Sequence, residues 1–452
     1  MGHRSPNPSA RRLAAVMIVM AMIVLAAPVA PQEQAARQSV AYVQCGWLLA
    51  IPGEAPRRNV TILVQGDRIV DIRPGIQIPG DDEAGAIIVD LSGCFVLPGL
   101  IDCHTHITFE LGPGARLQGL QQSDADTAIK AAVFAKRTLD AGFTTIRNVG
   151  SSGDAAFAVR DAIRDGLIPG PRIIAAGHAI TPTGGHGDHT HGFREDLFEV
   201  PTPAEGVADG PDACRQAVRT QVKRGADVIK LTATGGVLSE TAAGTDQQFF
   251  DDELEAIVET AHWLGRKVAA HAHGADGIKA ALRAGVDSIE HGTFLDDEAI
   301  RLFRQHGTYL VPTMLAGVTV TNMAEVPDLL PPVVAEKARQ VGPRIHEACA
   351  RAHQAGVKIA FGTDSGVSPH GHNAQEFALM VAAGFEPMQA IKSATINAAD
   401  LCSVLDQVGT IEPGKQADFI ALAADPLADI TELTRVMFVM RAGVVHKTAE
   451  RD

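Results

Sequence analysis

From about residue 100 to residue 400, short apolar runs alternate with longer segments whose apolar residues recur at helical spacing. The short runs predict buried strands, and the longer segments predict amphipathic helices. Eight strands are predicted, at Leu100–His106, Thr144–Val149, Arg172–Ala176, Val228–Leu231, Val268–His271, Ser288–Glu290, Tyr309–Val311 and Lys358–Phe361. Helices are predicted at Ala125–Ala141, Ala155–Asp165, Asp212–Arg224, Asp251–Leu264, Ala275–Ala284, Asp297–Gln305, Ala335–Ala355, Asn373–Ala383 and Pro387–Ala399. Eight strands that alternate with helices predict a (β/α)8 TIM barrel, whose active site lies at the carboxyl ends of its strands.

Short strands and turns flank this region on both sides. They are expected at Val60–Gln65, Arg68–Ile72 and Ala86–Leu91 before it, and at Val408–Ile411, Ala417–Ala421 and Val436–His446 after it. We expect the two groups of strands to join into one small domain beside the barrel. The fold class is therefore α/β: a barrel of residues 98–404 beside a small β-sandwich domain made of residues 37–97 and 405–449.

The composition excludes some classes of partner. The chain has 452 residues, of which 46% are apolar, so it can bury a substantial core. Its formal net charge is −14, which disfavours binding to nucleic acid and to anionic membrane surfaces.

The N-terminus has the pattern of an export signal. Arg4, Arg11 and Arg12 precede Leu13–Ala30, a run without charged residues. A basic flank, an apolar run and small residues are typical of a secretory signal peptide. We expect residues 1–36 to be a signal peptide and pro-linker, and the mature protein to be periplasmic or secreted, without membrane contact. An uncleaved anchor helix is the alternative, because the run is just long enough to span a bilayer.

The chain contains six cysteines, none of them in a Cys-x-x-Cys pair. A thiol metal site or redox motif of that type is therefore not expected. An oxidising compartment would allow disulfides, but most of these cysteines lie in apolar contexts that are typical of core residues.

The first predicted barrel strand ends in His104-Thr105-His106. Residues i and i+2 of a strand point to the same face, so the two imidazoles would project together and could chelate a divalent metal. A single pair of this kind is more often two polar residues that end a strand. Three further strand ends supply His271, His291 and Asp364. Their agreement at one face of a barrel predicts a metal centre.

Lys230 lies inside the apolar run of the fourth strand. Burial of an ammonium group is costly and lowers its pKa, which makes the amine nucleophilic. Such a lysine can take up carbon dioxide and become a carbamate, which is an anionic ligand that bridges two metals. An ion pair with Glu290 or Asp364 is the alternative.

These residues resemble the pattern of the amidohydrolase superfamily. The resemblance extends over Val40–Lys447 and rests on Gly99–His106, Gly409–Asp418, Lys230, His271, His291 and Asp364. The chain looks closest to the branch that holds imidazolonepropionase and metal-dependent Xaa-Pro dipeptidases. Its segments Lys230–Gly236 and His271–Gly274 are similar to the peptidase side, which includes enzymes that cleave the amide of ochratoxin, an N-acyl phenylalanine. Imidazolonepropionase uses one metal and lacks the bridging lysine, so Lys230 argues against that activity.

The resemblance implies a binuclear centre of two divalent metal ions, with zinc as the expected metal. His104, His106 and Asp364 would hold the first ion, and His271 and His291 the second. Lys230, carboxylated by carbon dioxide, and a hydroxide would bridge the ions. The hydroxide would attack an amide carbonyl, and Asp364 would take its proton and deliver it to the leaving amine.

Two other histidines are candidates for substrate contact. His273 shares a strand face with His271, and we interpret it as a substrate-contacting or carbonyl-orienting group; a structural hydrogen bond is the alternative. His186 lies in the loop Gly184–Gly192 and is the preferred oxyanion or carboxylate contact, although a solvated loop or a third metal site has the same pattern. Backbone N–H groups of Thr234–Ser239 could also face an anionic substrate end.

The chain has two tyrosines, Tyr42 and Tyr309, and neither is predicted at a carboxyl strand end. A tyrosine clamp on a substrate carboxylate is therefore not expected, which leaves room for a range of acyl groups. We expect a secreted metal-dependent amidohydrolase, assembled as a homo-oligomer, that cleaves a peptide or N-acyl amino acid bond. A cyclic amide or lactone hydrolase with the same site is the alternative. A non-catalytic, metal-stabilised protein is disfavoured, because a structural site needs no base such as Asp364.

Overall fold

The computed structural model describes residues 40–448, except residues 81, 82, 84, 113 and 241–243. The predicted signal peptide and pro-linker lie outside the described residues. None of the helices that are described is both long and apolar enough to cross a membrane.

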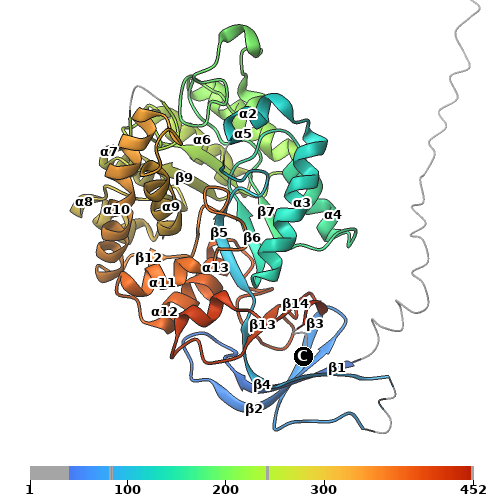
Figure 1. The fold of residues 1–452 in the computed structure, drawn as a ribbon. Coiled ribbons are helices and arrows are strands. Elements are labelled where there is room, and N and C mark those ends of the chain that lie inside the picture. The colour runs from blue at the N-terminus through green and yellow to red at the C-terminus, as the bar shows by residue number, and fades with distance from the viewer. Residues whose placement is uncertain (1–39, 81–82, 84, 113, 241–243, 449–452) are drawn as a thin grey trace, which may run out of the picture.

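Eight parallel strands form the centre of the larger part of the molecule (Figure 1). They are β5 (Leu100–Thr105), β6 (Phe143–Asn148), β7 (Arg172–Ala175), β8 (Ile229–Thr232), β9 (Val268–Ala272), β10 (Ser288–His291), β11 (Tyr309–Val311) and β12 (Lys358–Ile359). The eight predicted strands are all present. Among the described residues they form two sheets, in the orders β5-β6-β7 and β12-β11-β10-β9-β8, and not one continuous sheet. The arrangement is an α/β fold of the TIM-barrel type.

Backbone hydrogen bonds outside the regular strand pairs connect the two sheets. The Ile180 N–H donates to the Lys230 carbonyl at 2.8 Å, just beyond β7. On the other side the Cys103 N–H donates to the Phe361 carbonyl at 2.9 Å, and the Asp364 N–H donates to the His104 carbonyl at 2.8 Å. These bonds hold Lys230, His104 and Asp364 at the same end of the strands, although the segment after β12 is irregular.

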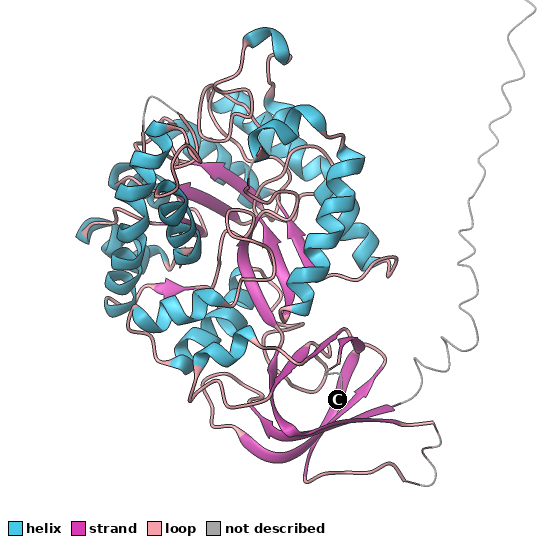
Figure 2. Ribbon diagram, in the orientation of Figure 1, coloured by secondary structure: helices cyan, strands magenta, loops and turns pink. Residues whose placement is uncertain are grey.

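Helices surround these strands on the outside (Figure 2). They are α2 (Ala115–Gln121), α3 (Asp124–Asp140), α4 (Ala155–Arg164), α5 (Pro211–Arg224), α6 (Asp251–Trp263), α7 (Ala275–Ala284), α8 (Asp297–His306), α9 (Met314–Ala324), α10 (Pro332–Gln354), α11 (Gln375–Ala382), α12 (Pro387–Lys392) and α13 (Ala398–Leu401). The predicted helices are confirmed within a few residues, but the last one is divided between α12, a π-helical turn at Ser393–Asn397 and α13. Helices α2 and α9 were not predicted. Helix α9 carries apolar residues on every side, so its sequence lacks helical periodicity.

The flanking strands hydrogen-bond as one seven-stranded sheet. It consists of β1 (Val40–Leu48), β2 (Arg57–Gln65), β3 (Arg68–Pro74), β4 (Ile87–Pro98), β13 (Phe419–Leu422), β14 (Phe438–Arg441) and β15 (Val444–Lys447). Antiparallel pairing of β4 with β13 joins the N-terminal and C-terminal segments, which lie side by side at one end of the molecule (Figure 1). The strand predicted at Val408–Ile411 is wrong, because this segment is a turn-rich loop. Strand pairing shows a single sheet, so a sandwich of two sheets and the domain boundaries stay predictions.

A buried carboxylate holds the beginning of helix α9. Glu376, in α11, is 0% exposed and accepts hydrogen bonds from the backbone N–H groups of Met314 at 2.9 Å and Leu315 at 2.6 Å. These are N–H groups that the first turn of a helix leaves unpaired. Burial raises the pKa of Glu376 to about 8, because its effect exceeds that of the two backbone donors, which lower the pKa.

The raised pKa of Glu376 predicts a pH dependence of stability. Between the ordinary pKa of 4.5 and about 8, the folded chain keeps a proton on Glu376 that the unfolded chain has lost. The free energy of unfolding should therefore fall as pH rises through this window, by at most about 1.4 kcal/mol per pH unit. Urea unfolding of the wild type and Glu376→Gln at pH 5 to 8 measures this. For Glu376→Gln the free energy of unfolding should change less with pH than for the wild type, and the exposed Glu259→Gln should follow the wild type. The same pH dependence in all three proteins would contradict a raised pKa of Glu376.

Candidate metal centre and its cavity

All of the site residues predicted from the sequence line one cavity of about 540 Å³. They come from six strand ends or the loops that follow them: His104, His106, His186, Lys230, His271, His273, His291 and Asp364. His189, from the same loop as His186, also lines this cavity. Tyr42 and Tyr309 do not; their hydroxyls hydrogen-bond to Glu83 and Asp400. The cavity therefore gathers the predicted chemistry in one place.

Three of these side chains converge through atoms that all carry lone pairs. His104 Nε2 and His106 Nε2 lie 3.5 Å and 3.2 Å from the same oxygen, Asp364 Oδ1. The other ring nitrogen of His106, Nδ1, faces the Gly150 carbonyl at 3.0 Å, and a carbonyl can only accept a hydrogen bond. Likewise His104 Nδ1 lies 2.7 Å from the Glu290 carboxylate. Both Nε2 atoms are therefore unprotonated in the neutral rings, and Asp364 Oδ1 is buried without a hydrogen-bond donor.

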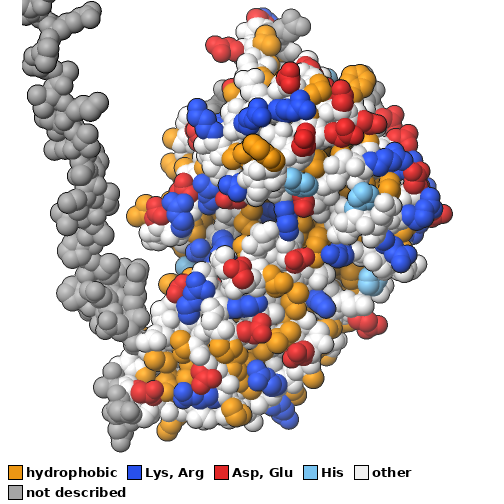
Figure 3. All heavy atoms as spheres, turned by 180° about the vertical axis from the view of Figure 1, so that it is seen from behind, with side chains coloured by type: hydrophobic (Ala, Val, Ile, Leu, Met, Phe, Trp, Pro, Cys, Tyr) orange, Lys and Arg blue, Asp and Glu red, His pale blue; other side chains and the backbone are white. Residues whose placement is uncertain are grey.

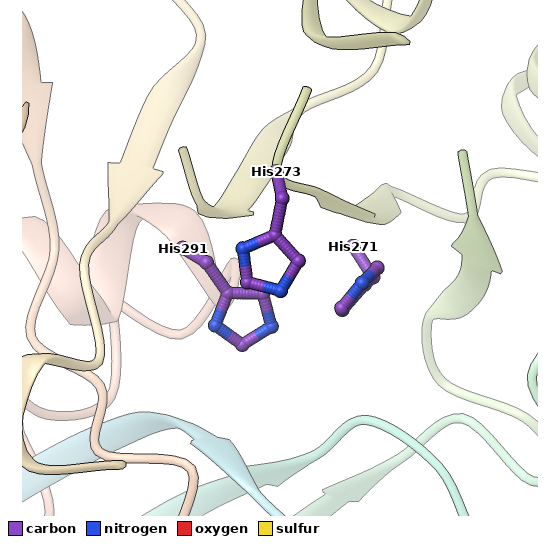
Figure 4. Close-up of side chains that lie close together, drawn as sticks. All are labelled: His271, His273 and His291. Atoms are coloured by element: carbon purple, nitrogen blue, oxygen red, sulfur yellow. The ribbon is translucent and has the colours of Figure 1, made fainter. Parts of the chain in front are cut away.

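Three histidines form a second cluster at the ends of β9 and β10 (Figure 4). One ligand atom each of His271, His273 and His291 lies within 4.8 Å of the others. The His273 and His291 rings stack with their centroids 4.9 Å apart, and His271 stands beside them. The Thr313 hydroxyl donates to the Pro312 carbonyl, so it accepts from His291 Nδ1 at 2.7 Å. The His291 Nε2 is then free to bind a cation.

The chemistry of this donor set fits divalent metal ions. Burial lowers the pKa of His104 to about 4 and that of His273 to about 3, and it holds the pKa of His271 and His291 well below the usual value. These four imidazoles are therefore neutral near pH 7. Burial raises the pKa of Asp364, but the charged groups nearby, Lys230 among them, hold it below its usual value, so its carboxylate is ionised. Neutral imidazoles and a carboxylate that face one another without protons between them repel, and a bound cation would relieve this repulsion.

Lys230 enters this group from β8, where it is 3% exposed. Burial lowers its pKa to about 8, so a minor fraction of the amine, about a tenth, is unprotonated at pH 7. The carboxylates of Glu290 and Asp364 make their close contacts with Arg147, His104 and His106, and neither forms an ion pair with Lys230. The alternative of a Lys230 ion pair has no direct contact to support it.

A buried network behind His104 was not predicted from the sequence. Glu290 accepts from His104 Nδ1 through one oxygen, and through the other from Arg147 Nη2 at 2.8 Å and the Ser288 hydroxyl at 2.5 Å. Arg147 is 1% exposed and also donates from Nε to the Cys103 carbonyl at 2.6 Å. Although burial raises the pKa of Glu290, Arg147 and His104 lower it to about 2. Glu290 therefore stays ionised and fixes the His104 ring, as partners of metal-binding histidines commonly do. The sequence feature that could have indicated this network is Arg147, a charged residue inside a strand that was predicted to be buried.

Three residues around the centre have a left-handed backbone. The φ angles are 70° at His291, 54° at Thr313 and 58° at Asp364. This conformation is unfavourable for residues other than glycine and is retained only where surrounding contacts impose it. The hydrogen bond between His291 and Thr313 is one such contact, and two of the strained residues, His291 and Asp364, are themselves predicted ligands.

The loop Thr234–Ser239 closes over His186. The His186 ring packs against Gly236, where a Cβ atom would lie 2.2 Å from the ring. His186 Nδ1 is 2.9 Å from the Ser239 hydroxyl, and Lys337 of α10 donates to the Gly236 carbonyl at 2.5 Å. Glycine at residue 236 is therefore needed for His186 to reach the cavity, and Lys337 connects the loop to α10.

Helices α9 and α10 supply an apolar wall of the cavity. Ala316, Gly317 and Val320 of α9 and Val341 and Ile345 of α10 line the cavity. These side chains are small or aliphatic, so this side of the cavity can receive an apolar group.

The chain has been compared with known proteins. A profile described as the amidohydrolase family matches residues 95–447. The ochratoxinase of Aspergillus niger is 33% identical over 424 residues, which cover 88% of this chain and 85% of that protein. The structure of a Xaa-Pro dipeptidase with bound methionine in its active site is 43% identical, has a TM-score of 0.86, and covers 90% of this chain and 100% of that chain. The structure of a prolidase complexed with N-methylphosphonate-L-proline is 31% identical, with a TM-score of 0.82 and coverage of 91% and 100%.

The buried network predicts a large effect of Arg147 on stability. Arg147→Ala leaves the ionised Glu290 buried without its guanidinium partner, which costs about 3–5 kcal/mol for a buried ion pair. The free energy of unfolding, measured with guanidinium chloride, should fall by about this amount. Arg164→Ala, which removes an exposed pair with Asp161, should change it by less than about 1 kcal/mol. Equal effects of the two substitutions would show that the buried network does not stabilise the fold.

Proposed function

This chain belongs to the amidohydrolase family and is a hydrolase that acts on amide bonds, and on that premise we propose that it cleaves dipeptides or N-acyl amino acids. The observation that carries the proposal is the convergence of imidazole lone pairs on Asp364 Oδ1 inside a cavity large enough for a small substrate. The similarity to an Xaa-Pro dipeptidase with bound methionine, and to ochratoxinase, supports an amide whose amine side is an amino acid.

The proposed centre binds two divalent cations. His104, His106 and Asp364 hold one ion, and His271 and His291 hold the other; Lys230, carboxylated by carbon dioxide, lies between them. The low pKa of the imidazoles supports these assignments, since metal ligands must be unprotonated. Zinc is the proposed metal, because sites of imidazole and carboxylate suit it. When bound, such ions polarise an amide carbonyl and lower the pKa of a water in the site.

Asp364 is the proposed proton carrier. Its carboxylate is ionised, so the oxygen that does not hold the cation can take a proton from the attacking water. The same oxygen can then deliver that proton to the leaving nitrogen, which would otherwise depart as a poor amide anion. His273, held through Nδ1 by Thr293 at 2.7 Å, is placed to orient the substrate carbonyl. His186, fixed over the cavity by Gly236 and Ser239, is a second contact for the substrate.

The rest of the cavity bears on substrate choice. No tyrosine lines it, and the wall formed by α9 and α10 is apolar. A substrate with an apolar side chain on one side of the amide fits this wall better than a charged one.

Secretion, implied by Leu13–Ala30, and assembly as a homo-oligomer are part of the proposal. On the face seen in Figure 3 acidic and basic side chains are interspersed, in keeping with a small-molecule substrate and not a nucleic acid.

A substrate panel tests the proposed activity. The protein, produced with zinc in the medium, should hydrolyse N-acyl amino acids or Xaa-Pro dipeptides, and Asp364→Asn should lower kcat by about 10²–10⁴-fold, because it removes the proton carrier. Release of the free amino acid measures turnover, and Glu259→Gln serves as an unaffected carboxylate control. Turnover of lactones or cyclic amides with no turnover of linear amides would reject this function in favour of the alternative hydrolase.

Metal content tests the role of Lys230. Wild-type protein should retain close to two metal ions per chain by elemental mass spectrometry, and Lys230→Ala should retain fewer, because the bridging carboxylate is lost. Added acetate or propionate should restore metal to Lys230→Ala, since a small carboxylate fits the space that the side chain leaves. Lys223→Ala, on the protein surface, should bind metal like the wild type. Full metal content in Lys230→Ala without added acid would disprove the carbamate bridge.

A further inference from the structure

Two thiols meet behind the strand that carries His104. The sulfur atoms of Cys103, in β5, and Cys402, at the end of α13, are 3.8 Å apart, although the residues are 299 positions apart in the chain. Cys103 is buried and Cys402 is partly exposed. No other pair of cysteines in the described part of the chain makes such a contact. Neither thiol has a part in the proposed hydrolysis, because both lie outside the cavity.

We propose that Cys103 and Cys402 are a site of reversible oxidation, at which a disulfide joins β5 to the end of α13. The oxidant is a small-molecule disulfide such as oxidised glutathione. This inference does not depend on the proposed amide substrate or on bound metal.

The geometry allows this bond with a small displacement. The sulfurs must approach by about 1.8 Å to reach the disulfide length of about 2.05 Å. Cys103 is held in place, since its neighbour Asp102 accepts from the His104 N–H at 3.0 Å and the Asn373 amide at 2.7 Å. Cys402 follows the four-residue helix α13 and precedes a turn. The displacement therefore falls on Cys402, and the strand that carries His104 keeps its position.

The surroundings favour Cys402 as the first thiol to react. The hydrogen bond with Cys103 lowers the pKa of the Cys402 thiol. Burial raises this pKa, but the Arg147 and Lys267 cations lower it further, and the net shift is downward. The Lys267 ammonium also donates to the Leu401 carbonyl at 3.0 Å, which places this cation next to Cys402. Cys402 as a residue is partly exposed, and it is the thiolate with the lowered pKa that attacks a small disulfide.

The chemistry balances in two exchange steps. The Cys402 thiolate attacks one sulfur of the oxidant, whose S–S bond breaks and releases one small thiolate. The Cys103 sulfur then attacks Cys402 in the mixed disulfide, its proton passes to the second leaving thiolate, and the protein disulfide forms. Two protein thiols are oxidised, and one small disulfide is reduced to two thiols. The closed loop of about 300 residues restricts the unfolded chain, so the bond should raise the stability of the folded protein.

Peptide mapping tests the proposal. The full-length protein is incubated with oxidised glutathione, unfolded with N-ethylmaleimide present, digested without reduction and analysed by mass spectrometry. We expect one cross-linked peptide pair that contains Cys103 and Cys402, lighter by two hydrogens than the sum of the two peptides and absent after reduction. The oxidised protein should melt several degrees above the reduced protein, and this difference should disappear in Cys402→Ser.

The matched control is Cys214→Ser, which removes a buried thiol that contacts only the Ala208 carbonyl. It should retain both the cross-link and the rise in melting temperature. Complete maleimide labelling of Cys103 and Cys402, a stable adduct of glutathione on Cys402, or a disulfide that involves other cysteines would each overturn the proposal. Because wild-type peptides carry the main result, a folding defect in Cys402→Ser would not obscure it.

Discussion

The need to balance lone pairs and negative charge at the ends of the strands governs this structure. Asp364 and Glu290 are both buried and ionised, and the His104 imidazole between them is neutral. Among the described residues, Arg147 is the cation that contacts Glu290 directly. Removal of charge from water is costly unless each charge has a close partner. Glu290 has such a partner within the protein, whereas Asp364 Oδ1 faces only imidazole nitrogens, which is why a metal ion is the natural complement there.

The same need explains how rigidly the centre is built. Glu290 holds the ring of His104, and Arg147 holds Glu290. Arg147 also donates to the backbone carbonyl just before His104. On the opposite side, His291 donates to Thr313, the residue before α9, and Glu376 accepts from the first N–H groups of that helix. The strand ends that carry the predicted ligands and the apolar wall of the cavity are therefore parts of one connected framework. Left-handed backbone at His291, Thr313 and Asp364 is tolerated because these contacts outweigh its cost.

Several elements were predictable because their signals are local. The eight central strands appear as apolar runs, and most helices have one apolar face, so both were found within a few residues. Helix α9 was missed because it is buried on several sides and has no polar face to give it a period. The segment Val408–Ile411 was wrongly predicted as a strand; its apolar residues are buried, as in a strand, but its backbone forms turns. A buried apolar residue can belong to a strand or to a loop, so the apolar pattern alone does not specify the backbone conformation.

By itself the sequence determined the residue types at the strand ends and their spacing, and these were enough to predict that His104, His106, Lys230, His271, His291 and Asp364 gather in one place. In a parallel α/β fold every strand ends at the same side, so the position of a residue along its own strand indicates which face it shares with the others. Only the tertiary structure decided that Arg147 pairs with Glu290, that α9 and α10 wall the cavity, and that Cys103 meets Cys402. These contacts join side chains that are distant in sequence, and their distances depend on how helices and loops pack, which no local pattern of residues encodes.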